Sequence, residues 1–338
     1  MRGAIIHAPG DVRIEDRPDP VITAPTDAII EVSATCVCGS DLWRFRGINE
    51  VPRPTPIGHE SCGVVVEVGA DVTRVKPGDF VVASFYSCDG TCPHCRAGFT
   101  SVCQNLDWMD GCQSTHIRIP QADGTLHPTP GMPSADQLPD LLALSDVMGT
   151  GWHAAVMAGV QPGMTVAVVG DGAVGLCGVL AAAELGAVRV IAMSRHESRQ
   201  RLAREFGATD IVETRGDEGI AEVLELTRGI GADAVLECVG TGEAMTQALA
   251  CARPGAMVGF VGVPHGIDLN IRTLFDSNVG IRGGMAAVGN YLPDLMTRVL
   301  DGRIHPGKVF DATFGLDDIL EAYRAMDERR AIKSLVLP

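Results

Sequence analysis

Three short segments, far apart in the chain, carry the residue types that hold a catalytic zinc ion. Cys38 lies in the run Cys-Val-Cys-Gly-Ser-Asp and His59 in the run Gly-His-Glu, whereas Asp146 comes much later in the chain. A thiolate, an imidazole and a carboxylate make a three-ligand zinc site with one open position, as catalysis requires. Singly, the same residues are more often a buried thiol, a turn residue and a helix cap. Their combination favours a metal centre.

A second group of potential metal ligands is confined to one short stretch. Cys92, Cys95 and Cys103 follow a C-x2-C-x7-C spacing, which is typical of a closed structural zinc site. A fourth ligand would come from Cys88 or from Asp89, and the softness of a thiolate favours Cys88. The alternatives for this stretch are free surface thiols or a disulfide.

A glycine motif in the second half of the chain predicts a dinucleotide site. An apolar run that ends at Val169 leads into the pattern G-x-G-x-x-G, and a helical stretch is expected at Leu176–Leu185. Glycines there permit a tight turn, the close approach of a pyrophosphate and the packing of helix on strand. The alternative is a glycine-rich turn without a ligand. The predicted contacts are Gly170, Gly172, Ala173, Val174 and Gly175.

The end of the next predicted strand bears on which dinucleotide is bound. A site that prefers NAD places an acidic residue there for the ribose 2'-hydroxyl, but this chain has Ser194 followed by Arg195. A hydroxyl beside a guanidinium suits a 2'-phosphate, so the sequence favours NADP over NAD, with Arg199 as a further contact. The alternative is that Arg195 is solvated and that Glu197 serves as a displaced acid.

Two different patterns of residue types along the chain indicate two domains that would position these groups. The first part, up to about Leu144, has short β-rich runs between Pro and Gly turns and predicts a barrel-like all-β domain. The next part alternates apolar strands with helices, which is the pattern of a parallel α/β sheet. We expect residues 1–148 and 288–338 in one domain and residues 149–287 in the other. The strands of the α/β sheet are expected at Thr165–Val169, Val188–Met193, Ala234–Glu237, Met257–Gly262 and Gly280–Gly283.

The last fifty or so residues carry two more expected elements. They are one amphipathic helix at Asp317–Asp327 and a terminal strand at Ser334–Leu337, and we expect this segment to fold back onto the first domain.

Bulk composition excludes several classes of protein. The chain has 338 residues, 46% of them hydrophobic, and a formal net charge of -15. Such a chain can bury a large core, and its charge argues against nucleic acid or an anionic membrane as a partner. No signal peptide or membrane span is expected. The odd number of cysteines, 11, together with no secretory signal, indicates a reducing compartment, and we expect a cytoplasmic protein.

Taken together, the motifs make the chain resemble the zinc-containing medium-chain alcohol dehydrogenases over essentially its whole length. The resemblance implies a GroES-like β-barrel catalytic domain that carries the metal and a Rossmann cofactor domain with a doubly wound parallel sheet. The matching residues are Cys-Gly-Ser-Asp at 38–41, Gly-His-Glu at 58–60, Val-Lys-Pro-Gly-Asp at 75–79, the cysteine cluster at 88–103 and the glycine motif at 170–175.

The family pattern assigns roles to the residues around the first metal site. It implies that Cys38, His59 and Asp146 bind the catalytic zinc, with Asp146 where many relatives have Cys. Asp at this position, with the Ser-Arg pair, matches bacterial NADP-dependent secondary-alcohol dehydrogenases. The resemblance also implies that Glu60 approaches the zinc as an alternative ligand. It implies that Ser40 bonds the substrate oxygen and passes its proton outward.

Other positions either agree with the family pattern or depart from it. Thr150 would contact the nicotinamide end of the cofactor by resemblance. Trp43 stands where several relatives place a proton-relay His, so it is expected either to wall the substrate pocket or to pack under a loop. The family's C-x2-C-x2-C register falls on Asp89 and not on Cys88, so the register slightly favours the carboxylate as the fourth structural ligand.

These residues predict a zinc-dependent enzyme that moves a hydride between NADP(H) and a small alcohol or its carbonyl partner. A simple secondary alcohol with its ketone, or an aldehyde, is favoured over a polyol, sugar or amino alcohol. A cofactor-binding module that has lost its chemistry is the alternative from another functional class. The resemblance implies a homodimer or homotetramer.

Overall fold

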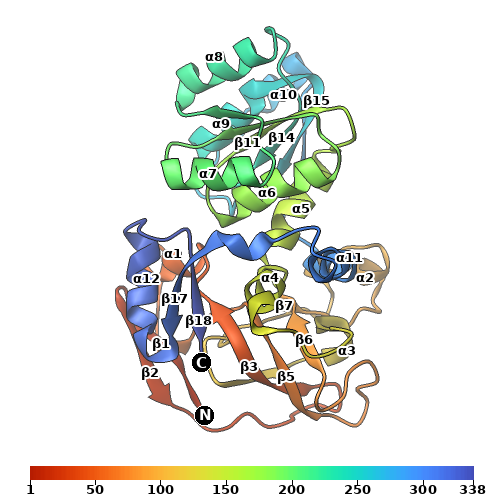
Figure 1. Cartoon of the computed structure of the whole chain (residues 1–338), viewed down its shortest axis with the longest axis vertical. Helices are drawn as coiled ribbons and strands as arrows, with labels where there is room; N and C mark the ends of the chain where they lie inside the picture. The colour runs from red at the N-terminus through yellow and green to blue at the C-terminus, as the bar shows by residue number, and fades with distance from the viewer. The chain divides into compact units, whose positions relative to one another are not determined.

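The computed structural model describes residues 1–338, which form two compact units. The first unit contains Met1–Asp146 and Ala287–Pro338, and the second contains Val147–Ala286 (Figure 1). The sequence placed the two boundaries after residues 148 and 287, slightly too late. Helix α5 (Val147–Met157) begins directly after Asp146 and belongs wholly to the second unit.

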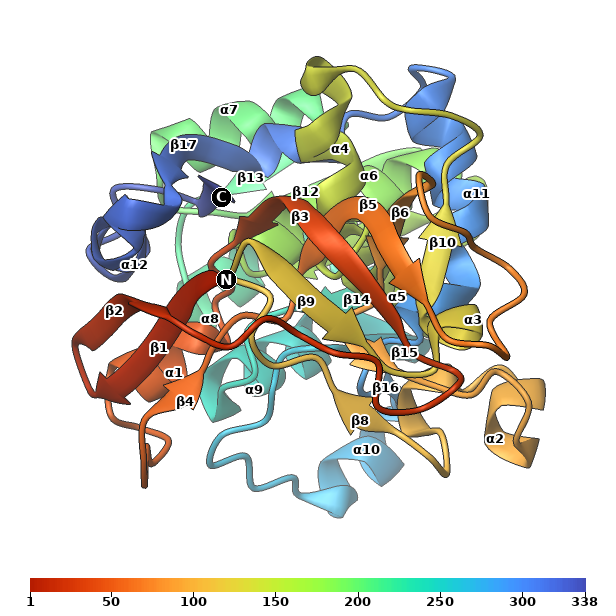
Figure 2. The ribbon, with the colours of Figure 1, turned by 90° about the horizontal axis from the view of Figure 1, so that it is seen from below.

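A seven-stranded sheet forms the centre of the first unit. Its strands follow the order β10-β6-β5-β3-β18-β17, and β9 also pairs with β3, as Figure 2 shows for most of them. Three alternate residues of β3, Ala28, Ile30 and Val32, are buried in one core that also contains Ile119 and Leu126. This alternation is the two-residue period of a strand that packs one face on a core. The strands of the first unit are β1 (Arg2–Ala8), β2 (Asp11–Asp16), β3 (Ala28–Cys36), β4 (Thr55–Pro56), β5 (Ser61–Val68), β6 (Phe80–Ala83), β7 (Tyr86–Ser87), β8 (Asp107–Trp108), β9 (His116–Ile119), β10 (Leu126–Pro128), β17 (Phe310–Gly315) and β18 (Lys333–Leu337).

Short helices connect these strands. The helices of the first unit are α1 (Asp41–Phe45), α2 (Pro93–Arg96), α3 (Ala122–Thr125), α4 (Leu138–Ala143), α11 (Val288–Leu300) and α12 (Ile319–Asp327). The single helix predicted at Asp317–Asp327 starts as a separate 3-10 turn at Leu316–Asp318, and only α12 is α-helical.

The end of the chain completes the first unit, as the sequence predicted. Strand β18 pairs antiparallel with β3, where Leu335 opposes Cys36, and runs parallel to β17. Helix α12 buries Ile319 and Tyr323 in a core that also contains Leu42 of α1. The last strand therefore lies beside the strand that leads to Cys38.

The second unit is a doubly wound parallel sheet. Its strand order is β13-β12-β11-β14-β15-β16, and every pair is parallel. This is the arrangement of a Rossmann fold, in which the first strand lies at the centre. Helices α5 and α6 contact each other, whereas α8 and α9 form a separate contacting pair on the opposite side of the sheet. The elements of this unit are α5, β11 (Thr165–Val169), α6 (Ala173–Glu184), β12 (Arg189–Met193), α7 (Glu197–Glu205), β13 (Asp210–Val212), α8 (Gly216–Leu226), β14 (Ala232–Glu237), α9 (Gly242–Cys251), β15 (Ala252–Phe260), α10 (Ile271–Ser277) and β16 (Gly280–Gly283).

All five strands predicted for this sheet are present, with differences at their ends. Strand β15 ends at Phe260, and Gly262, predicted to be inside it, lies against the Gly240 loop, where an added Cβ would be 2.1 Å from the Gly240 nitrogen. The chain therefore leaves the ladder to pack on that loop. None of the helices combines the length and the apolar character needed to cross a membrane.

Candidate active site and metal centres

The first candidate metal site lies where strands β3 and β5 meet. Cys38 follows the end of β3 and His59 precedes β5, and the two strands pair at Thr35 and Ser61. Asp146 reaches the same point after α4. The Sγ atom of Cys38 is 3.6 Å from Oδ2 of Asp146, which is 3.5 Å from Nε2 of His59.

The donor set of this cluster fits zinc. One ligand atom from each of Cys38, His59, Glu60 and Asp146 lies within 4.8 Å of the others. Three of these residues are the predicted ligands, and sulfur, imidazole nitrogen and carboxylate oxygen are the donors that zinc takes. The Oε2 atom of Glu60 is buried without a hydrogen-bond partner, and a cation in the cluster could coordinate it.

His59 is oriented by a carboxylate that the sequence did not single out. Its Nδ1 atom lies 3.3 Å from Oδ1 of Asp41, so that Nε2 faces Asp146. The Oδ2 atom of Asp41 accepts hydrogen bonds from the backbone N–H of Cys38 at 3.0 Å and from the Gln113 amide at 3.3 Å. Such an outer carboxylate fixes the ring orientation of a metal-binding His. Asp41 is the last residue of the Cys-Gly-Ser-Asp motif, which was the available signal.

Charge around His59 outweighs its burial. Burial opposes the imidazolium form, but the carboxylates of Asp41 and Asp146 raise the pKa of His59 well above its ordinary value. The surroundings are therefore strongly anionic, as a site for a divalent cation should be.

Glu60 is held by a buried lysine from the other end of the chain. The Nζ atom of Lys333 lies 2.6 Å from Oε1 of Glu60 and donates to the Val37 carbonyl at 3.2 Å. Both charged side chains are only 1% exposed. Lys333 was not among the predicted site residues, although a lysine inside the apolar run Ala-Ile-Lys-Ser-Leu-Val-Leu could have indicated it.

Ser40 and Trp43 lie on or beside the short helix α1, close in sequence to Cys38. Ser40 precedes the helix, its side chain makes no capping hydrogen bond, and it is partly exposed. Its hydroxyl is thus available to a ligand. Trp43 is half-buried on α1.

The second candidate metal site contains Asp89 and not Cys88. Ligand atoms of Asp89, Cys92, Cys95 and Cys103 all lie within 4.8 Å of one another. The Sγ atoms of Cys92 and Cys95 are 3.5 Å apart. The Cys88 thiol instead donates to the Gly124 carbonyl at 3.2 Å.

Backbone N–H groups stabilise negative charge in this second cluster. Asp89 accepts from the N–H groups of Thr91 at 2.7 Å and Cys92 at 2.9 Å; burial opposes its charge, but these bonds hold the pKa of Asp89 well below its ordinary value. The N–H of Gln104 is the main cause that lowers the pKa of Cys92 to about 7. Thiolate character of this kind favours metal binding. His94 faces away, with Nδ1 2.7 Å from the Val102 carbonyl oxygen.

In the second unit, the glycine motif forms the turn between β11 and α6. Gly170 has φ +115°, and a Cβ on Gly175 would lie 2.0 Å from the Gly170 carbonyl oxygen, so both positions require glycine. A Cβ on Gly172 would meet nothing within 4 Å. Ala173 and Val174 open α6, which begins at the turn, earlier than the predicted Leu176. The open space at Gly172 before a helix N-terminus fits a cofactor phosphate.

Ser194, Arg195 and Arg199 all lie near the carboxyl end of β12, but they are not equivalent. Arg195 is exposed. Ser194 is buried and donates to Oδ2 of Asp171 at 2.9 Å, and Nη1 of Arg199 lies 3.2 Å from Oδ1 of the same carboxylate. Asp171, the residue between the first two glycines, thus joins two of the predicted NADP contacts.

Thr150 is buried on α5. This helix packs closely on α6, because a Cβ added to Gly151 would be 2.5 Å from the Gly178 nitrogen.

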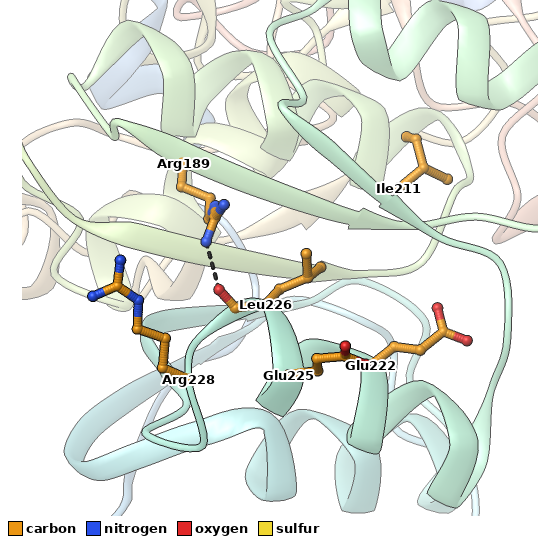
Figure 3. A pocket seen from close by; sticks show the side chains of 6 residues that line it. All are labelled: Arg189, Ile211, Glu222, Glu225, Leu226 and Arg228. Atoms are coloured by element: carbon orange, nitrogen blue, oxygen red, sulfur yellow. Dashed lines mark hydrogen bonds between the residues drawn. The ribbon is translucent and has the colours of Figure 1, made fainter.

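A surface pocket elsewhere in the second unit is unrelated to the predicted cofactor contacts. Figure 3 shows it at the amino end of β12, where Arg189 donates to the carbonyl of Leu226 at the end of α8. The glycine motif lies at the opposite, carboxyl edge of the sheet, where cofactors of α/β sheets bind.

Comparison with known proteins gives a consistent result for both units. A family model described as an alcohol dehydrogenase GroES-like domain matches residues 24–131, and one described as a zinc-binding dehydrogenase matches residues 173–301. The zinc-type alcohol dehydrogenase B of Aspergillus flavus is 34% identical over 98% of this chain and 80% of its own length.

Solved structures of dehydrogenases are similar to this chain over its full length. An alcohol dehydrogenase from Thermus sp. ATN1 has a TM-score of 0.93 at 28% identity, with 100% of this chain and 99% of that chain covered. A zinc-binding dehydrogenase from Sinorhizobium meliloti bound to NADP has a TM-score of 0.84 at 25% identity, with 100% and 99% covered.

Proposed function

Because this chain belongs to the zinc-containing medium-chain alcohol dehydrogenase family, we propose that it transfers a hydride between NADP(H) and a small alcohol or its carbonyl partner. Membership of the family makes it an oxidoreductase that acts on alcohols. The proposed substrate pair is a secondary alcohol with its ketone, or an aldehyde with its alcohol. The observation that carries the proposal is the convergence of Cys38, His59 and Asp146 from three distant segments. Zinc and a nicotinamide cofactor are the groups implied by the family.

The residues of the first cluster divide the work. Cys38, His59 and Asp146 would hold the zinc, and Asp41 orients His59 for that purpose. When bound, zinc supplies a Lewis acid for the substrate oxygen, and the nicotinamide supplies or accepts the hydride. The hydroxyl of Ser40 would bind the substrate oxygen and carry its proton outward. Trp43 would form an apolar wall beside a substrate with some hydrocarbon surface.

We propose the second unit as the NADP(H) site. The turn with Gly170, Gly172 and Gly175, followed by Ala173 and Val174 at the helix N-terminus, would receive the pyrophosphate. Thr150 would contact the nicotinamide end. A serine and an arginine, Ser194 and Arg195, stand where NAD sites have an acid, and the relative from Sinorhizobium meliloti is bound to NADP.

We further propose that Asp89, Cys92, Cys95 and Cys103 hold a second, structural zinc. Four ligands from one loop leave no position for substrate, which is typical of structural sites.

The experiment that tests the function is a rate measurement with zinc-loaded protein. NADPH and NADH oxidation are followed over a panel of simple ketones, aldehydes, keto sugars and amino ketones. Faster turnover of simple ketones or aldehydes with NADPH supports the proposal. Selective turnover of a sugar or amino ketone would replace the proposed substrate class, and no turnover at all with zinc bound would contradict the enzyme.

A further inference from the structure

A buried carboxylate contacts two of the residues predicted to bind the 2'-phosphate of NADP, Ser194 and Arg199. Asp171 is only 7% exposed. Its two carboxylate oxygens accept hydrogen bonds from the Ser194 hydroxyl and from Nη1 of Arg199, and its backbone carbonyl accepts from the same Arg199 atom at 3.3 Å. Burial opposes its charge, but Arg199 and the Ser194 hydroxyl keep the pKa of Asp171 below its ordinary value, so it is an anion.

The position of Asp171 is as informative as its contacts. Strands β11 and β12 are neighbours, with Val169 opposite Met193, so Asp171 and Ser194 both leave the sheet at the same carboxyl edge. An NAD site places its acidic residue at the end of this second strand. Asp171 therefore brings a carboxylate from the glycine turn to the place where the strand itself has a serine.

Resting on the proposed function, we propose that Asp171 is a specificity-determining residue that limits the preference for NADP(H) and lets the same site accept NAD(H). Three effects of the carboxylate all shift the binding preference from NADP(H) toward NAD(H). Its negative charge repels a 2'-phosphate, and it occupies one donor of Ser194 and one of Arg199 that a phosphate would use. A carboxylate has about four acceptor positions, so an oxygen of Asp171 can still accept from a ribose 2'-hydroxyl.

The two charges of the pair should therefore act in opposite directions. Neutralising Asp171 removes a repulsion and frees both donors, which favours the 2'-phosphate. Neutralising Arg199 leaves the carboxylate uncompensated, which favours the 2'-hydroxyl. A carboxylate that merely held Ser194 and Arg199 in place for the phosphate would give the reverse result for the first change.

The test is equilibrium binding of NADPH and NADH to the zinc-loaded protein without substrate. In Asp171→Asn, the ratio of the NADH Kd to the NADPH Kd should rise about tenfold, and in Arg199→Leu it should fall. Asp233→Asn is a matched control, because Asp233 also pairs with an arginine, Arg253, and accepts from the N–H of Thr165 at the opposite end of β11. The control should leave the ratio unchanged.

Two readouts keep the outcomes distinct. The first is the ratio of the Kd values for 5'-AMP and adenosine 2',5'-bisphosphate, which repeats the comparison on the adenosine half of the cofactor alone. The second is the melting temperature of each variant, which shows that it folds. An unchanged ratio in Asp171→Asn, or a shift toward NADH, overturns the inference. The ratio in the unaltered protein tests the proposed NADP preference separately: if that protein binds NADH more tightly, the preference fails while a tenfold shift on substitution still supports the role of Asp171.

Discussion

The two metal clusters of the first unit are built in opposite ways. Asp89, Cys92, Cys95 and Cys103 come from one loop, and their charge is stabilised by backbone N–H groups of that loop, such as those of Thr91 and Gln104. Cys38, His59 and Asp146 come from three segments, and His59 is oriented by Asp41 from the segment of Cys38. A local cluster needs little more than its own turn, whereas a dispersed cluster needs the whole unit to be folded.

This difference has a chemical consequence. The local cluster offers four ligand atoms within 4.8 Å of one another, so it can close around an ion. The dispersed cluster has three donors, a fourth potential donor in the Glu60 carboxylate that pairs with Lys333, and the Ser40 hydroxyl, which makes no capping hydrogen bond. A metal there would keep a position for a substrate oxygen, as catalysis requires.

The largest effect is expected from a ligand of the dispersed cluster. Cys38→Ser should lower kcat/KM by at least about 10³-fold, because the Lewis acid is lost, while the local cluster keeps its ion. The measurements are zinc content and ketone reduction. Cys62→Ala is the control, since burial raises the pKa of that thiol to about 12 and Cys62 belongs to neither cluster. Unchanged turnover in Cys38→Ser would show that Cys38 is not a ligand of the catalytic zinc.

The next effect tests the long-range support of the dispersed cluster. Lys333→Met leaves the carboxylate of Glu60 buried and unpaired, which should lower the free energy of unfolding by about 3–5 kcal/mol. The measurement is denaturant unfolding of the zinc-loaded protein. The double variant Lys333→Met with Glu60→Gln should recover part of the loss, because no charge remains unpaired. Equal stabilities of the single and double variants would show that the pair is not coupled.

A smaller effect is expected from the orienting carboxylate. Asp41→Asn should weaken zinc binding or lower kcat by about 10–100-fold, because a neutral amide holds the His59 ring less firmly than the carboxylate does. Competition with a chelator measures the affinity. Asp110→Asn is a suitable control, since that carboxylate is exposed and pairs with Arg44. An affinity equal to that of the unaltered protein would mean that His59 is positioned by other contacts.

The smallest effect on turnover is expected at the local cluster. Asp89→Ala should release its ion and lower Tm by about 5 °C, whereas kcat before unfolding stays unchanged. Cys88→Ala should retain the ion, since the Cys88 thiol points to the Gly124 carbonyl. Retention in Asp89→Ala together with loss in Cys88→Ala would reverse the ligand choice.

The sequence located the donors but not their supports. Cys38, His59 and the glycine motif stand in recognisable local patterns, and the strands β11 and β16 have the predicted bounds. Lys333 lies 273 residues from Glu60, and no local pattern can show that pairing. The contact between Asp171 and Ser194 likewise depends on the register of two strands. Segment ends also differed, as at Gly262, because tertiary packing decides where a ladder stops.

The most direct test of the two-cluster arrangement is the zinc content of the purified protein, measured by elemental mass spectrometry without chelators. We predict about two zinc ions per chain, and about one in either Cys38→Ser or Asp89→Ala. A content of one ion per chain that survives either substitution, or no bound zinc at all, would contradict the arrangement.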